Sequence, residues 1–333
     1  MFRRVLAAAA ATALVLTAAA CGGDDDTAAA GGKPGKIVIG YQQIPNGDLI
    51  VKHNKWLEQA FGDATTIEWK LFDSGGSVNE AIQAGSVDLG LVGSSPASRG
   101  ISSGIKYRVP WIFDVIGEAE ALAVKGGISD VTQLKGKTIA TPFASTAHYS
   151  LLAALQKAGL DAKSVKVIDS EPDAILAAWK RGDIDGAYVW NPVLAKLLAD
   201  GGTTLVTSAE LAKDGKTTYD LAVVTDEFAE KYPDAVKTWV AQQDKAVKQI
   251  KASPDDAAAA IAAELSITPA EAKAQMDDLI FVDAAAQAGD EYLGQGLPDN
   301  LFATAKFNRD VGQITTVRDE KTYADAVDSS FVE

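Results

Sequence analysis

The segment "TPFASTAHYS" (residues 141–150) gathers groups that could either perform chemistry or bind an anion. Ser145, Thr146 and Ser150 surround His148, one of two histidines in the chain. A serine beside a histidine could be a nucleophile with its base. The segment also follows a predicted strand and precedes an apolar run. Ser145 or Thr146 could therefore cap a helix whose free N–H groups bind an anion. Both interpretations stay open at this point.

A second segment, "GSSPAS" (residues 93–98), has the same character. Ser94 and Ser95 stand before Pro96, a residue that favours the first turn of a helix. Two helix starts facing each other across a cleft would favour a negatively charged ligand, because orphan N–H groups and helix dipoles both attract anions. The alternative is two ordinary helix caps. The chain has no H-E-x-x-H, P-loop or G-x-G-x-x-G motif. We expect no cofactor, no metal and no catalytic residue.

The N-terminal segment indicates where the protein is located. Arg3 and Arg4 precede an apolar stretch and small residues that end at Cys21, which is typical of a lipoprotein signal peptide over residues 1–20. Cys21 is the only cysteine in the chain, which excludes intrachain disulfides. Residues 21–35 are small and acidic and predict a flexible tether. We expect a protein anchored by a lipid at Cys21, in the periplasm or on the extracytoplasmic face of the membrane.

Composition narrows the class of protein. The net charge is −14, so the chain is a poor candidate for binding nucleic acid. The whole chain has a hydrophobic content of 47%, and the roughly 300 residues beyond the tether are enough for two cores. Predicted strands and amphipathic helices alternate from residue 36 onward, which indicates an α/β architecture with parallel strands.

The same order of elements recurs about a hundred residues later. "GSVDLGLVG" (85–93) and "GDIDGAYVW" (182–190) match at equal spacing, which predicts two lobes of like topology. Chance similarity between two helix-to-strand turns is the alternative. Two adjacent crossings, near 120–127 and 219–230, would make a two-segment hinge. We expect lobe 1 at residues 36–122 and 225–333, and lobe 2 at residues 123–224.

Carboxylates stand at both expected crossings. Glu120 precedes one apolar strand and Asp220 precedes the other. A carboxylate at a strand end near a cleft could receive an ammonium group, and Trp190, at the end of its own strand, could cover the cation. The alternatives are a salt bridge at the hinge and a tryptophan in the core.

These segments resemble a known family. "FDSGGS", "GSSPAS", "EALAVK", "GKTIATPFASTAHYSLLAAL", "AAWKRGDIDGAYVWNP" and "YDLAVV" are similar to the taurine-binding proteins of ABC importers, within the alkanesulfonate-binding group of type II solute-binding proteins. The resemblance implies a type II periplasmic-binding-protein (Venus flytrap) fold without catalysis. It places serines, Thr146 and His148 at the sulfonate, and Glu120 and Asp220 at the amine. The expected ligand-binding residues are Gln42, Asp73, Ser94, Ser95, Glu120, Ser145, Thr146, His148, Tyr149, Trp190 and Asp220.

The expected function follows from this resemblance. We expect a monomeric lipoprotein that captures taurine between its lobes and delivers it to a membrane permease driven by an ATPase. The first alternative is a binder of other small alkanesulfonates or of oxyanions such as nitrate, which would leave Glu120 and Asp220 without a role. The second is an enzyme of the thiamin-pyrimidine-synthase type, which would use His148 chemically. The third is an adhesin or scaffold, which would bind no small molecule.

Overall fold

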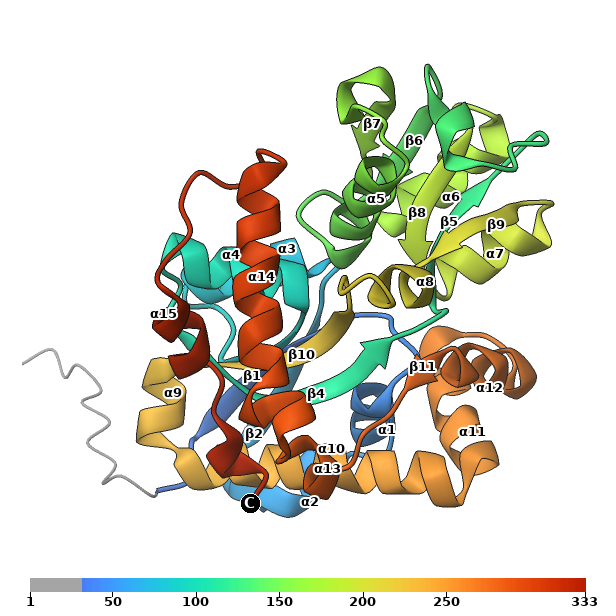
Figure 1. The fold of residues 1–333 in the computed structure, drawn as a ribbon. Helices are drawn as coiled ribbons and strands as arrows, with labels where there is room; N and C mark the ends of the chain where they lie inside the picture. The colour runs from blue at the N-terminus through green and yellow to red at the C-terminus, as the bar shows by residue number, and fades with distance from the viewer. Residues whose placement is uncertain (1–31) are drawn as a thin grey trace, which may run out of the picture.

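The structure is a computed structural model that describes residues 32–333, and it contains two β-sheets, each with helices on both faces (Figure 1). The expected signal peptide (1–20), the lipidation site Cys21 and most of the expected tether (21–35) lie outside the described residues. The first sheet has six strands in the order β11-β4-β10-β3-β1-β2. Their bounds are β1 Lys36–Tyr41, β2 Thr66–Leu71, β3 Leu89–Gly93, β4 Tyr107–Ile116, β10 Thr218–Thr225 and β11 Leu279–Ile280.

The second sheet has five strands in the order β7-β6-β8-β5-β9. In the first sheet β2, β1 and β3 are parallel, and the next strand, β10, runs antiparallel to them. In the second sheet β7, β6 and β8 are parallel, and the next strand, β5, runs antiparallel to them. The bounds of the second sheet are β5 Glu120–Val124, β6 Thr138–Thr141, β7 Lys166–Asp169, β8 Gly186–Trp190 and β9 Thr203–Thr207.

The two sheets are topological repeats of each other. Reading outward from β2 gives β2-β1-β3-β10-β4, and the second sheet reads β7-β6-β8-β5-β9 in the same pattern. The matched segments 85–93 and 182–190 end in β3 and β8, which occupy equivalent central positions. The prediction of two lobes with like topology is therefore confirmed.

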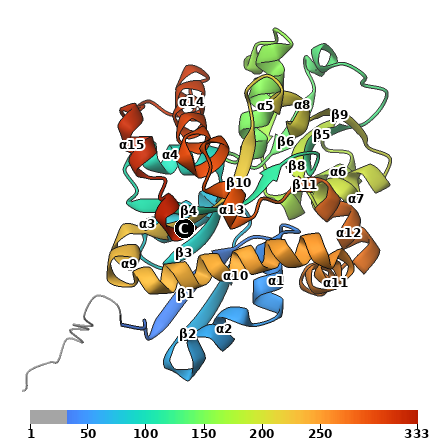
Figure 2. The same cartoon turned by 60° about the horizontal axis from the view of Figure 1, so that its bottom comes forward.

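Helices cover the first sheet on both faces. On one face, α1, α10 and α11 bury the side chains of β1, β3 and β4 that point toward them, and α10 runs along the sheet with α1 beside it (Figure 2). On the other face, α3, α4, α14 and α15 enclose a second apolar layer. The helices named for this lobe are α1 Gly47–His53, α2 Trp56–Phe61, α3 Gly75–Gln83, α4 Ser94–Ser103, α9 Asp226–Lys231, α10 Pro233–Ala252, α11 Pro254–Leu265, α12 Pro269–Asp277, α13 Ala284–Gln287, α14 Gly296–Asp310 and α15 Glu320–Asp325.

The second lobe repeats this layering on a smaller scale. Its cores lie on the two faces of the five-stranded sheet, one under α5 and α8 and the other under α6 and α7. The helices are α5 Thr146–Lys157, α6 Pro172–Arg181, α7 Val193–Ala199 and α8 Ser208–Ala212. In the described part of the chain, residues 32–333, no helix combines the length and the apolar character that a membrane span requires.

The lobe boundaries differ from the expected ones. The boundary expected at 122 would assign Glu120 to the first lobe, yet β5 pairs with β8 and β9 of the second sheet. The boundary expected at 224 would assign β10 to the second lobe, yet β10 pairs with β3 and β4. Short segments at 117–119 and 213–217 make the crossings. The apolar runs taken as crossings are complete strands, because their backbone groups are already used in sheet ladders.

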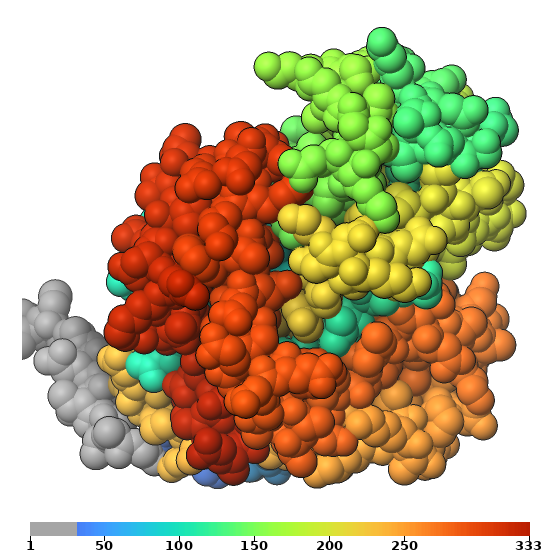
Figure 3. All heavy atoms as spheres, in the orientation of Figure 1, coloured from blue at the N-terminus to red at the C-terminus, as the bar shows by residue number. Residues whose placement is uncertain are grey.

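Helix α14 reaches from the first lobe to the second. Its first half packs on α4, where Ser98 Oγ donates a hydrogen bond to Leu301 O at 2.8 Å. Near its end, the ring of Phe307 packs edge-on against Tyr149 of α5, with 4.8 Å between centroids. The space-filling view shows these red C-terminal helices against the green second lobe (Figure 3).

Candidate functional site

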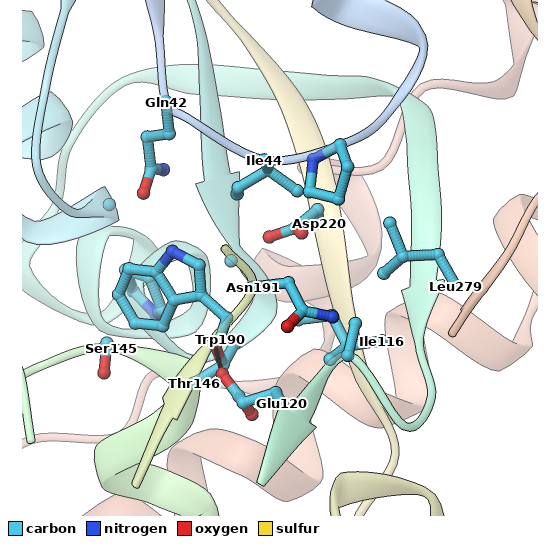
Figure 4. Close-up of a pocket in the computed structure, with 15 residues that line it drawn as sticks. Gln42, Ile44, Ile116, Glu120, Ser145, Thr146, Trp190, Asn191, Asp220 and Leu279 are labelled. Carbon is cyan, nitrogen blue, oxygen red and sulfur yellow. Dashed lines mark hydrogen bonds between the residues drawn. The ribbon is translucent and has the colours of Figure 1, made fainter. Parts of the chain in front are cut away.

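A cleft between the lobes contains the candidate site (Figure 4). The space not filled by protein atoms there is about 410 Å³, a figure that includes open solvent at its mouth. Hinge residues and second-lobe strand ends form one side, and first-lobe loops and helix starts form the other. The lining residues are Gln42, Ile44, Pro45, Gly75, Gly93, Pro96, Ile116, Ala119, Glu120, Ser145, Thr146, Trp190, Asn191, Asp220 and Leu279.

Three helices begin at this cleft. Helix α3 contributes Gly75, its first residue, and α4 contributes Gly93, its N-cap. Helix α5 contributes its N-cap Ser145 and its first residue Thr146. The N–H groups of a first helical turn have no partner within the helix, and they carry the positive end of the dipole. Three such ends around one cleft favour an anionic group, as two were predicted to do.

The hydroxyl groups at the start of α5 serve the protein itself. Ser145 Oγ accepts from His148 N at 3.1 Å and donates to Pro142 O at 2.6 Å, so it is the N-cap of the helix. Thr146 Oγ1 donates to Glu120 Oε2 at 2.5 Å. Both residues line the cleft, as expected. Because their hydroxyl protons are already used, the donors that an anion would meet here are backbone N–H groups.

Glu120 lies at the base of the cleft and is fully buried. Besides Thr146, its carboxylate accepts from Ser208 Oγ at 2.7 Å and from Ser150 Oγ at 3.3 Å. Burial raises the pKa of Glu120 to about 7, against the lowering effect of these hydroxyls. All three of its recorded donors are neutral, so the site holds a carboxyl group that a cation would stabilise.

A second buried carboxyl group, Asp220, lines the cleft from the first lobe. It stands directly opposite Asp114 in the antiparallel β10–β4 ladder, and each of the two carboxyl groups affects the pKa of the other. Burial, with Asp114 and Glu120 close by, holds the pKa of Asp220 well above its usual range. Burial also raises the pKa of Asp114 to about 7. None of the cleft-lining residues is a lysine or an arginine.

The electrostatics of the cleft are therefore divided. The two acids Glu120 and Asp220 favour a positive group, and the starts of α3, α4 and α5 favour a negative one. In the β10–β3 ladder Asp220 pairs with Gly93, the N-cap of α4, so the two regions are adjacent. This arrangement suits a small zwitterion that carries both charges within a few bonds.

Three further polar or aromatic side chains border the cleft. Gln42 was predicted, and its amide Nε2 donates to Leu91 O at 2.9 Å while the side chain lines the site. Trp190 was also predicted, and it faces Glu120 across the β5–β8 ladder. Asn191 was missed. Its Nδ2 donates to Asp278 Oδ2 at 3.0 Å, which links the second lobe to the loop before β11.

The two serines predicted as ligand contacts in α4, Ser94 and Ser95, bond to other parts of the protein in this structure. Ser94 Oγ accepts from Tyr219 N at 3.2 Å, which ties α4 to β10. Ser95 Oγ accepts from Asn308 Nδ2 at 3.3 Å, which ties α4 to α14. Both serines are buried and neither lines the cleft. Their hydroxyls are used for packing helices because the first turn of α4 points them away from the ligand side.

His148 is likewise not a cleft residue. Its ring stacks on Phe143, with centroids 4.4 Å apart, and lines a separate hollow between α5 and the end of α14. Its Nδ1 faces Ala144 N at 3.4 Å. Burial, and then the charge of Arg99, lowers the pKa of His148 to about 4. The alternative of an enzyme that uses His148 therefore has no histidine among the cleft-lining residues.

Tyr149 and Asp73 also lie elsewhere. The ring of Tyr149 is buried against Phe307. Asp73 lines a neighbouring hollow, beside Trp190 and Pro172.

Among the described residues, a G-x-S-x-G spacing occurs at Gly100–Gly104, but it lies at the end of α4, where the Ser102 hydroxyl donates to Ser98 O. It is therefore not the strand-to-helix turn that a nucleophile elbow requires.

Comparison with solved structures defines the class. The alkanesulfonate-binding protein of Xanthomonas axonopodis pv. citri, bound to MOPS, aligns with a TM-score of 0.74 over 89% of this chain and 98% of that one, at 22% identity. The nitrate-binding protein of Synechocystis PCC 6803 aligns with a TM-score of 0.72 over 89% and 86%, at 13% identity. At these identities the likeness shows the fold. The expected two-lobed periplasmic-binding-protein fold is thereby confirmed.

Sequence comparison then places the chain within this class. It belongs to the NMT1-like family, whose model matches residues 30–267. It is 43% identical over 190 residues to the taurine-binding periplasmic protein of Escherichia coli (strain K12), a match covering 57% of this chain and 59% of that protein. It is 32% identical over 234 residues to a putative aliphatic sulfonates-binding protein of Bacillus subtilis (strain 168), covering 67% and 68%. The resemblance to this group is thereby confirmed.

Proposed function

We propose that this protein is the solute-binding component of an ABC importer and that its ligand is taurine. The observation that carries the proposal is the divided cleft, in which Glu120 and Asp220 face the same small volume as three helix starts. Taurine is a zwitterion with its ammonium and sulfonate groups two carbons apart. The ammonium would lie at the acids and the sulfonate at the N–H groups, and Trp190 would cover the carbon chain.

The similarity to a taurine-binding relative supports this choice of ligand over simple sulfonates. A simple alkanesulfonate or nitrate satisfies only the helix starts, and it leaves two buried acids without a cation. An amine without an acid group satisfies only Glu120 and Asp220. The site distinguishes these classes by charge balance, because burying one unmatched charge costs more than a neutral contact gains.

A thermal-shift and calorimetric panel tests the ligand. Taurine, ethanesulfonate, ethylamine and nitrate carry, in turn, both charges, the anion alone, the cation alone and a smaller anion. We expect only taurine to raise the unfolding temperature strongly, since a ligand at 100 times its Kd adds about 2.7 kcal/mol. Ethanesulfonate or nitrate binding as tightly as taurine would replace this proposal with the oxyanion alternative.

The cellular role is proposed along with the ligand. The protein would be exported by a signal peptide at 1–20, lipidated at Cys21, and held as a monomer outside the cytoplasmic membrane. There it would pass taurine to a permease powered by an ATPase.

Deleting its gene should abolish uptake of labelled taurine, and Cys21→Ala should move the protein from the membrane fraction to the soluble fraction. Unchanged uptake in the deletion strain would contradict the importer role.

A further inference from the structure

Asp114 is a buried acid that the proposed contacts leave unexplained. Its residue is fully buried on β4, and it is not among the residues that line the cleft. One oxygen, Oδ2, accepts from Asn46 Nδ2 at 2.9 Å. The other, Oδ1, has no hydrogen-bond partner among the described residues.

Asp114 and Asp220 are buried and stand opposite each other in the β10–β4 ladder. Two carboxylates so placed cannot both be ionised away from water without a large energetic cost. The other charged group that affects the pKa values of this pair is also an acid, Glu120 of β5. Asn46, at the start of α1, is neutral. Beyond it lies Asp48, whose carboxyl accepts from Gln243 Nε2 at 2.7 Å. Lys52, also on α1, acts on Asp48 and is paired with Glu264. The described groups that act on the Asp114–Asp220 pair include no cation, so a proton is the counter-charge available to it.

We propose that Asp114 is a positioning residue that sets the ligand specificity of Asp220: in the empty protein the two carboxyl groups share one proton, and a ligand ammonium group displaces that proton into solvent. The inference rests on the proposed function. The exchange conserves charge, since one positive ammonium enters as one proton leaves. An amine-free sulfonate brings nothing to replace the proton, so the pair keeps both its shared proton and its single negative charge.

Proton release makes affinity depend on pH with a definite sign. Binding that expels one proton weakens as protons become more abundant, so the affinity for taurine should fall by up to about tenfold for each unit by which pH drops below the titration of the pair. Ethanesulfonate should show no such slope. This contrast is measurable on the unmodified protein, so it does not depend on a variant that folds.

The decisive experiment is isothermal titration at neutral pH in phosphate and in Tris, whose ionisation enthalpies differ. The wild type should release between half a proton and one proton per taurine and none per ethanesulfonate. Asp114→Asn keeps the shape and offers Asp220 a permanent N–H donor. The variant should still bind taurine, release almost no proton, and lose the pH dependence of its affinity.

Glu120→Gln is the matched control, because Glu120 is the other buried acid of the cleft. This variant should keep the proton release even where its affinity falls. Taurine binding by the wild type without proton release, or release that Glu120→Gln abolishes and Asp114→Asn retains, would overturn the role of Asp114. An absence of taurine binding by the wild type would instead overturn the proposed function itself.

Discussion

Gly93 of the first lobe and Thr146 of the second approach so closely that a Cβ added to Gly93 would lie 2.6 Å from Thr146 Cγ2. The next atoms, Cδ and Cγ of Pro96, would be at an ordinary 3.5 Å. The backbone at Gly93, with φ −70° and ψ 161°, is one that alanine adopts without strain. The absent side chain is therefore required by contact between the lobes and not by local conformation.

Gly93→Ala should weaken taurine binding by at least tenfold, because the clash acts where the lobes meet. Gly93→Ala combined with Thr146→Ser should restore most of the affinity, since serine keeps the hydroxyl and removes the methyl group. Calorimetric titration of both variants measures this. Gly35→Ala, where nothing lies within 4 Å of the new Cβ, is the control. Failure of the double variant to recover would place the effect elsewhere.

Asp220→Asn should separate ligands by charge. Removing the carboxylate that receives the ammonium should cost about 2 kcal/mol or more for taurine, and much less for ethanesulfonate, which has no cation. Competition titrations of both ligands against wild type and variant give the comparison. Equal losses for the two ligands would mean that Asp220 supports the fold of the site and not the amine.

Trp190 should report ligand binding by fluorescence. Of the six tryptophans, Trp111, Trp179 and Trp239 are fully buried, and Trp190 lines the cleft. Taurine should change the emission and saturate at one ligand per chain. Trp190→Phe should remove most of that change, whereas Trp69→Phe, at a half-buried position on β2, should preserve it. A signal that survives in Trp190→Phe would assign the change to another tryptophan.

His148 should affect acid stability and not ligand binding. Its pKa in the folded protein is about 4, and the usual value of 6.5 applies when the chain unfolds. Between these values the unfolded chain takes up a proton that the folded protein refuses, so stability falls as pH drops from 6.5 toward 4, by roughly 3 kcal/mol at most. His148→Gln should flatten this loss in urea unfolding curves and retain most taurine affinity. The buried acids have raised pKa values, so their contribution to the stability changes with pH in the opposite direction. The effect of His148 is therefore measured as the difference in unfolding free energy between wild type and variant at each pH.

The architecture could be predicted from the sequence because hydrophobic periodicity indicates the strands and helices, and because their order repeats along the chain. The matched segments ending in β3 and β8 implied two like lobes. Positions at strand ends and helix starts also predicted Glu120, Ser145, Thr146, Trp190 and Asp220 as site residues, and all five line the cleft. At these positions the local sequence pattern is sufficient, because strand ends and helix starts are the parts of the fold that form the cleft.

The errors have a geometric origin. Successive helical residues turn by about 100°, so when Ser145 and Thr146 face the cleft, His148 and Tyr149 point to its flanks. Asp114 was missed because "WIFDVI" reads as an apolar strand with one polar residue. Its partner Asp220 lies about a hundred residues further along, and only the β4–β10 ladder brings the two together. Contacts of α14 with α5 escape sequence reasoning for the same reason.

The placement of β10 between β3 and β4 also determines which lobe can fold first during synthesis. The second lobe is one uninterrupted stretch whose five strands are complete once β9 has been made. The first lobe begins earlier in the chain, yet it lacks an inner strand until β10 follows, and it lacks its covering helices until the C-terminal segment is present. During synthesis and export, the lobe encoded in the middle can therefore mature ahead of the lobe encoded at both ends. The ligand site needs residues of both lobes, including Asp220 of β10, so it cannot form when the second lobe alone is complete.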